Sequence, residues 1–172
     1  MTNFIIVCAL EQELPPEKNP YIDKTYYTGM GMLNASLKVA ELIHQLSPDL
    51  VVNYGTCGAC NLNLSGLIEC GIISNRHAYA TLDFNSEIIL SKDKNKLSSG
   101  DDFVTRTLSN VDVVDMEGYA IAYTCQKYST KFKCYKYITD YVSFSGYAEW
   151  NKNVSDGYPS FLQTFDNYLG EK

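Results

Sequence analysis

Short apolar runs that alternate with helical patterns are the feature that most limits the fold of this chain. The run FIIVCAL (4–10) contains no polar residue and is typical of a buried strand. Further strands are predicted at KTYYTGMG (24–31), DLVVNY (49–54), LIECGIIS (67–74), EIILS (87–91), VDVV (111–114) and KCYKYIT (133–139). This order predicts an α/β protein with one central mixed, twisted β-sheet flanked by helices.

Apolar residues spaced by three or four predict the helices between these strands. The first helix has its apolar positions at Leu33, Leu37, Ala40, Ile43 and Leu46, and Ser47 and Pro48 end it. A second helix follows Glu117, and a closing amphipathic helix begins at Pro159 with Phe161, Leu162, Phe165 and Leu169 on one face. A loop at SSGDD (98–102) and a short helix after it complete the expected order.

Composition narrows the class of protein. A chain of 172 residues predicts a single domain, 1–172, and 45 % hydrophobic residues indicate a globular protein. The net charge of -6 argues against a nucleic-acid surface, and Lys92, Lys94 and Lys96 are interpreted as a solvated loop. There is no apolar run of about 20 residues and no basic leader, so we expect a cytoplasmic protein that does not enter a membrane.

Six cysteines fit a reducing compartment better than a disulfide framework. Cys57 and Cys60 form a C-x-x-C, which leaves a redox dithiol as one hypothesis, but the turn-like NLNLSG follows where such a pair needs a helix. A second C-x-x-C is absent, and His44 and His77 have no ligand spacing. We therefore expect no metal and no cofactor.

The stretch VVDMEGYAIAYTCQK (113–127) places two carboxylates where a buried strand meets a helix. One interpretation is a capped helix start, with Asp115 as the cap and Glu117 at the positive helix end. The other is a functional site, because a buried carboxylate must find partners or change its pKa.

Acids also follow other predicted strands, which favours the second interpretation. Glu11 and Glu13 come after the first strand, and Asp140 closes the strand YIT. Because sites in α/β sheets gather where strands end, these acids are expected to meet in one pocket.

Six motifs in this order resemble the nucleosidases and phosphorylases that act on purine and pyrimidine nucleosides. They are ALEQEL (9–14), TGMGMLNAS (28–36), NYGTCGA (53–59), SGDDF (99–103), VVDMEGYAIA (113–122) and ITDYVS (138–143). The likeness is greatest to the 5'-methylthioadenosine/S-adenosylhomocysteine nucleosidases. It implies a nucleoside phosphorylase-like fold, a small-molecule nucleoside substrate and a homodimer.

The resemblance implies roles for the acids. Glu13 matches the carboxylate that activates the attacking water, and Asp140 the acid that protonates N7 of the departing adenine. Glu117 matches the residue that holds the ribose hydroxyls, with Met116 against the sugar. This suits the chemistry, because cleavage of an N-glycosidic bond develops positive charge on the ribose and negative charge on the base.

The resemblance also implies the apolar contacts of the substrate. Phe103 matches a ring that stacks on the base, Val104 a residue whose backbone reads the base edge, and the GTCG turn places Cys57 and Gly58 beside the base. Met30, and by spacing Trp150, match the pocket for the 5' substituent.

Other interpretations of these residues stay open at this stage. Glu13 is alternatively a surface acid, Asp140 a turn cap, Phe103 a core ring and Trp150 a packing residue. The rival functions are a phosphate-dependent phosphorylase and a family member that binds a nucleoside without turnover. The span between the Ile72 strand and SGDDF is also shorter than in this family, where it usually carries an extra helix and part of the dimer contact.

Overall fold

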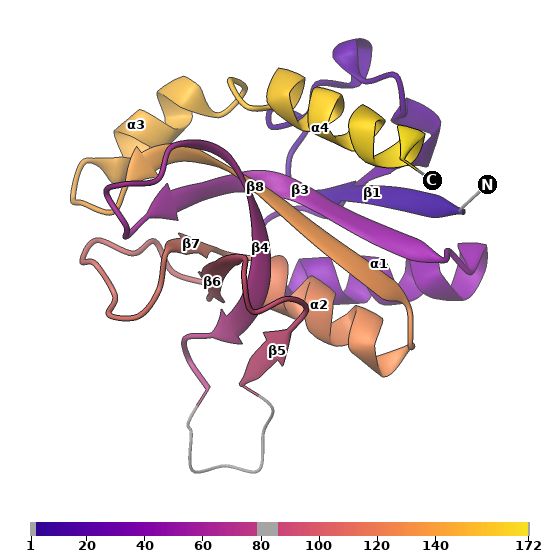
Figure 1. The fold of residues 1–172 in the computed structure, drawn as a ribbon, viewed down its shortest axis with the longest axis horizontal. Helices are drawn as coiled ribbons and strands as arrows, with labels where there is room; N and C mark the ends of the chain where they lie inside the picture. The colour runs from indigo at the N-terminus through magenta and orange to yellow at the C-terminus, as the bar shows by residue number, and fades with distance from the viewer. Residues whose placement is uncertain (1–2, 79–85, 172) are drawn as a thin grey trace.

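The computed structural model describes residues 3–78 and 86–171, so the predicted domain limits 1 and 172 lie outside the described residues. In the described part of the chain, eight strands form one mixed sheet with helices packed against it (Figure 1). The strands are β1 (Phe4–Cys8), β2 (Thr25–Tyr27), β3 (Leu50–Ala59), β4 (Gly66–Asn75), β5 (Glu87–Ile89), β6 (Asn95–Ser99), β7 (Val113–Asp115) and β8 (Lys131–Tyr141). The helices are α1 (Met32–Leu46), α2 (Gly118–Lys127), α3 (Gly146–Asn153) and α4 (Tyr158–Gly170), with 3₁₀ turns η1 (Pro16–Lys18) and η2 (Ile22–Lys24). The predicted α/β class is confirmed.

The long strands β3 and β8 form the centre of the sheet. β3 runs parallel to β1 and β8 and pairs antiparallel with β7. β4 pairs antiparallel with β8 and β5 and parallel with β6, and β6 pairs parallel with β7. The pairings β3-β7-β6-β4-β8 therefore close into a ring, and β3 and β8 are held on both sides.

Helices cover the sheet on opposite sides. In Figure 1, α4 lies over one face, α1 and α2 lie over the other, and α3 lies near the ends of β3 and β8. Phe161 and Phe165 of α4 are buried against Phe4 and Tyr54. Val39 of α1 belongs to the core shared by β1 and α2. No helix within residues 3–78 and 86–171 is long and apolar enough to cross a membrane.

Helix α1 exists as predicted but buries a different face. It ends at Leu46, where Ser47 adopts a left-handed conformation with φ 45°. The buried residues are Ala35, Val39, Leu42 and Ile43. Of the predicted core positions, Leu33, Leu37 and Leu46 are exposed. Ala35 and Val39 belong to the core that α1 shares with β1 and α2, so Leu33 and Leu37 face outward.

Several predicted boundaries are wrong. The first strand ends at Cys8 rather than at 10, and GTCG is part of β3 rather than a turn, because β3 continues in parallel pairing with β8. β6 occupies part of the predicted loops, and its Lys96 is exposed as expected while Leu97 is buried. Its polar composition hid a strand that β4 and β7 pair with on both sides.

The short helix predicted after 98–102 is absent from residues 100–112, which form turns and loop. The segment VTRTLSNVD (104–112) is rich in β-branched residues and in Ser, Asn and Asp, which disfavour helix interiors. The sequence prediction also missed α3, which carries Trp150.

Candidate active site

A cavity of about 300 Å³ opens where β3, β7 and β8 end, and it brings the predicted site residues together. All ten of them line it: Glu13, Met30, Cys57, Gly58, Phe103, Val104, Met116, Glu117, Asp140 and Trp150. The volume lies at the lower end of the range for small-molecule sites, about 300–1,000 Å³. The structure therefore shows that these residues lie together, and their individual roles stay predictions.

Glu13 is buried in the turn after β1 and is not a surface acid. Its Oε1 accepts hydrogen bonds from the backbone N–H and the hydroxyl of Thr56, both at 2.7 Å. Its Oε2 accepts from the backbone N–H of Leu10 at 3.1 Å and from the thiol of Cys8 at 3.3 Å. Four donors from two strands and a turn therefore fix the orientation of this carboxylate.

Asp115, the last residue of β7, accepts a hydrogen bond at the start of helix α2, although the N-cap position of that helix is Glu117. Its Oδ2 accepts from the N–H of Gly118 at 2.9 Å, and its Oδ1 accepts from the hydroxyl of Ser99 at 2.5 Å. Its Oδ2 also pairs with Nζ of Lys136 at 2.8 Å. The prediction of Asp115 as the N-cap is therefore wrong by two positions, but its carboxylate does bind the first helical N–H, together with Ser99 and Lys136.

Glu117 has a different environment and faces the cavity. Its Oε1 accepts from the N–H of Gly31 at 2.7 Å, at the start of α1. Burial raises the pKa of Glu117 to about 8, and the charge of Asp115 adds to the rise, against the opposing effects of Lys136 and the Gly31 N–H. Asp115 thus binds the start of α2, and Glu117 remains available to bind a ligand in the cavity.

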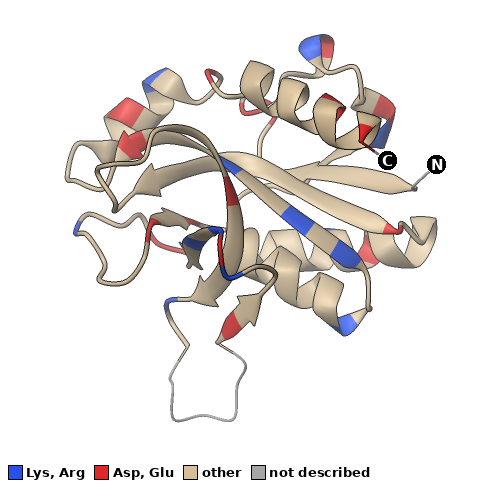
Figure 2. Ribbon diagram, in the orientation of Figure 1, with Lys and Arg blue, Asp and Glu red and all other residues tan. Residues whose placement is uncertain are grey.

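Lys136 is a member of this cluster that the sequence prediction missed. Figure 2 shows basic residues along β8, where Lys131 is exposed and Lys133 partly buried, whereas Lys136 is 1 % exposed. Burial acts to lower the pKa of Lys136, but the charge of its partner Asp115 acts in the opposite direction, and the pKa stays above its ordinary value. A single lysine inside the aromatic strand CYKYIT was the signal that could have revealed it, because an unpaired lysine is rarely buried.

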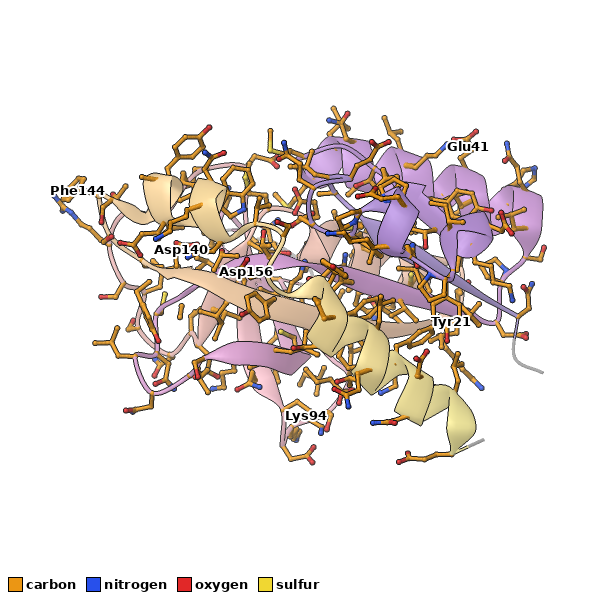
Figure 3. The ribbon with its side chains drawn as sticks, turned by 90° about the horizontal axis from the view of Figure 1, so that it is seen from above. Tyr21, Glu41, Lys94, Asp140, Phe144 and Asp156 are labelled. Atoms are coloured by element: carbon orange, nitrogen blue, oxygen red, sulfur yellow. The ribbon has the colours of Figure 1, made fainter. Side chains whose placement is uncertain are left out.

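Asp140 reaches the cavity through an irregularity in β8. Gly58 of β3 lies opposite Asp140 because Thr139 is an extra residue in β8. In a regular strand the side chain of Asp140 would lie on the same face of the sheet as that of Ile138. The extra residue forms a β-bulge, which turns the Asp140 side chain to the opposite face. Asp140 lies beside α3 (Figure 3) and within β8, which continues to Tyr141, and its carboxylate accepts the Thr139 hydroxyl rather than the backbone N–H of a turn.

The surroundings of Asp140 favour its protonated form. Burial raises the pKa of Asp140 to about 6, the Thr139 hydroxyl opposes this rise, and Glu149 adds to it. The Thr139 hydroxyl donates to Oδ1 at 2.8 Å. A carboxyl group with such a pKa can exchange a proton with a ligand near neutral pH.

The loop that carries Phe103 and Val104 is held by Arg76, another role that the sequence did not reveal. Its Nε donates to Oδ1 of Asp102 at 2.8 Å. Its remaining nitrogens donate to the backbone carbonyls of Ser98, Gly100, Asp102 and Asp115. Phe103 is 43 % exposed and is therefore not a core ring. A fully paired guanidinium thus anchors the wall that presents Phe103.

The wall of the cavity beside this loop is apolar and aromatic. Trp150 of α3 lies with its ring centroid 5.6 Å from that of Tyr147, and Tyr147 lies 5.9 Å from Phe103. Met30 is 53 % exposed at the edge. Trp150 is more than packing, because its Nε1 donates to Oγ1 of Thr56 at 2.9 Å.

The C-x-x-C does not have the surroundings of a redox pair. Cys57 is within β3 and Cys60 follows that strand, so no helix begins at either thiol. Burial raises the pKa of both thiols. Reactive dithiols show the opposite shift, so the structure argues against the redox hypothesis.

The fold and the site together define an α/β protein with an acid-lined cavity at the ends of its central strands. The sequence model of the phosphorylase superfamily matches residues 3–110. This chain therefore belongs to the phosphorylase superfamily.

Individual relatives agree with this assignment. A 5'-methylthioadenosine/S-adenosylhomocysteine nucleosidase of Staphylococcus carnosus (strain TM300) is 28 % identical to this chain, and the match covers 84 % of this chain and 73 % of the relative. The solved structure of a nucleosidase of the same name from Colwellia psychrerythraea 34H, in complex with adenine, has a TM-score of 0.86 and 19 % identity over 99 % of this chain and 96 % of that chain. Futalosine hydrolase of Helicobacter pylori strain 26695 has a TM-score of 0.87 and 15 % identity over 99 % and 98 % of the two chains. At these identities the structures establish the fold alone.

Proposed function

We propose that this protein hydrolyses the N-glycosidic bond of a purine nucleoside, 5'-methylthioadenosine and/or S-adenosylhomocysteine, and releases adenine. The observation that carries the proposal is that Glu13, Glu117 and Asp140 line one cavity in different electrostatic surroundings. Acid and base roles in catalysis depend on such differences between titratable groups. The nucleosidase from Staphylococcus carnosus supports the choice of substrate.

Three carboxyl groups divide the reaction between them. Asp140 donates its proton to N7 of the base, because its pKa of about 6 lets the protonated form exist near neutral pH. Glu13, whose carboxylate is fixed by four hydrogen bonds, orients and deprotonates the attacking water. Glu117 holds the ribose hydroxyls by hydrogen bonds in the transition state.

The remaining residues of the cavity hold the substrate. Phe103 stacks on the base, the Val104 backbone reads the base edge, and Met116 packs on the ribose. Cys57 and Gly58 lie beside the base. Met30 and Trp150 contact the 5' substituent, and their apolar surface favours a thioether.

The arginines favour water over phosphate as the nucleophile. Arg76 lines the cavity, but its donors are engaged by Asp102 and by backbone carbonyls. Arg106 is exposed and does not line the cavity. A phosphate ion would therefore lack a free cation among these two arginines and would meet the carboxylate of Glu13.

A panel of nucleosides incubated with and without inorganic phosphate tests this proposal. We expect free adenine and a free sugar at a rate independent of phosphate, with methylthioadenosine cleaved faster than AMP because a 5'-phosphate would be desolvated without a partner. Chromatography measures the base, and mass spectrometry identifies the sugar. Formation of a sugar 1-phosphate would show that the protein is a phosphorylase. Binding of a nucleoside without release of the base would show a non-catalytic member of the family. A preference for AMP would show that the substrate is a different one.

The proposal extends to assembly and location. Leu33 and Leu37 on α1 and Met30 at the cavity edge are all more than half exposed and form apolar surface next to the site. This surface supports a homodimer, which sedimentation at micromolar protein tests, since a monomer at that concentration would contradict it. The six cysteines are free thiols, which supports a reducing cytoplasm.

A further inference from the structure

A chain of hydrogen bonds connects helix α3 to the carboxylate of Glu13. The indole Nε1 of Trp150 donates to Oγ1 of Thr56 at 2.9 Å, and Oγ1 of Thr56 lies 2.7 Å from Oε1 of Glu13. Thr56 and Glu13 are both buried. Trp150 therefore reaches the proposed base through one intermediate hydroxyl.

The chemistry of the three groups fixes the direction of this chain. An indole nitrogen can only donate a hydrogen bond, whereas a hydroxyl has one proton to donate and lone pairs that accept. Because Trp150 occupies a lone pair of Thr56, the single hydroxyl proton is directed to Glu13. Without the indole N–H, the hydroxyl could rotate and leave Oε1 with one donor fewer.

Helix α3 also packs on the proposed acid. Gly146, its first residue, lies so close to Asp140 that a Cβ there would be 2.9 Å from Oδ2. The helix is tied to β8 by Asn153, whose side-chain nitrogen donates to the carbonyl of Thr139 at 2.8 Å. One short helix thus contacts the surroundings of both the acid and the base.

We propose that Trp150 is a positioning residue for Glu13, because its indole N–H fixes the Thr56 hydroxyl as a hydrogen-bond donor to the Glu13 carboxylate. The packing of α3 over the cavity therefore also orients the proposed general base. This inference rests on the proposed nucleosidase function. It assigns to Trp150 a role in turnover in addition to its apolar contact with the 5' group.

Other charged or titratable groups near Glu13 come from different elements. Cys8 lies on β1, Lys136 on β8, and Glu117 at the start of α2. The charged residues of α3 itself, Glu149 and Lys152, are exposed. A change confined to the indole nitrogen therefore alters the surroundings of Glu13 through Thr56 and leaves those groups in place.

The chain contains one tryptophan, so a ring analogue incorporated at tryptophan codons changes Trp150 alone. In benzothienylalanine a sulfur atom replaces the indole N–H while the ring keeps its shape. With this analogue, and with Trp150→Phe, we expect kcat for methylthioadenosine to fall about 3- to 10-fold, the scale of one neutral hydrogen bond. KM should change little for the analogue, and the acid limb of the pH profile of kcat should move to higher pH, because a carboxylate with fewer donors is protonated more readily.

A double-mutant cycle separates positioning from packing. Thr56→Val removes the intermediate hydroxyl, and in that background the analogue should cause no further loss in kcat. Thr56→Ser keeps the hydroxyl and should retain the response to the analogue. Lys152→Ala, an exposed substitution on the same helix, is the matched control and should leave kcat unchanged.

Two results would overturn the inference. One is an analogue protein with unchanged kcat and pH profile, and the other is an equal loss in the presence and absence of the Thr56 hydroxyl. Thermal melting of each variant establishes that it is folded, and the analogue protein keeps the test available if Thr56→Val does not fold. A wild-type protein that releases no adenine would instead refute the proposed function.

Discussion

Replacement of Asp140 by Asn is expected to lower kcat for methylthioadenosine by about 10²- to 10⁴-fold, the usual contribution of a general acid. The amide has the shape of the carboxyl group and can accept the Thr139 hydroxyl, but it cannot donate a proton to the base. Substrate binding should weaken little. Steady-state kinetics of adenine release measures both effects.

The pH dependence provides a second measure for the same variant. Because burial raises the pKa of Asp140 to about 6, the protonated acid is lost as the pH rises through that value. The kcat/KM of the wild type should fall above about pH 6. The residual kcat/KM of Asp140→Asn should not fall in this range, because the variant has no carboxyl group to lose a proton. Asp156→Asn is a matched control, because Asp156 is exposed between α3 and α4. Near-normal turnover of Asp140→Asn would remove this residue from the mechanism.

Glu117→Gln is expected to stabilise the folded protein at high pH, although it should impair substrate binding. Burial raises the pKa of Glu117 from 4.5 to about 8, so between these values the unfolded chain ionises while the folded chain keeps the proton. The folded state therefore loses stability as the pH rises through this window. At about 1.4 kcal/mol per pKa unit, we expect a gain of about 5 kcal/mol above pH 8 that disappears near pH 4.5.

Chemical denaturation at pH 5, 7 and 9 measures this difference. The amide oxygen introduced by Glu117→Gln would still accept the N–H of Gly31, so the fold should remain intact. Glu87→Gln, at an exposed position of β5, is the control and should change stability by no more than about 0.5 kcal/mol at any of these pH values. A gain independent of pH, or a loss of stability at pH 9, would show that Glu117 is not held protonated by its surroundings.

The sequence predicted the elements better than the contacts between them. Continuous apolar runs such as FIIVC predicted the buried strands, because a short strand that is apolar on both faces is typical of the interior of a sheet covered on both sides. The outward position of Leu33 and Leu37 was not predictable, since the packing of α1 on β1 and α2 decides which of its two apolar stripes is buried. β6 escaped prediction because its pairing depends on two strands distant in the sequence.

The same limit applies to the site. Motifs placed the acids Glu13, Glu117 and Asp140 at the ends of elements, and the structure brings them together. The partners that set their properties come from other strands and helices: Lys136 through its buried pair with Asp115, and Trp150 through Thr56. Spacing along the chain carries no information about such contacts, and the bulge at Thr139 that aims Asp140 depends on the register with β3.

The proposed reaction is cleavage, by water, of the bond between adenine and the sugar of methylthioadenosine. The most direct test is a time course with purified protein and methylthioadenosine in phosphate-free buffer, followed by chromatography of the base and mass spectrometry of the sugar. We expect one free adenine and one free methylthioribose for each nucleoside consumed. Unchanged nucleoside after prolonged incubation with folded protein, or cleavage that begins only when phosphate is added, would contradict it.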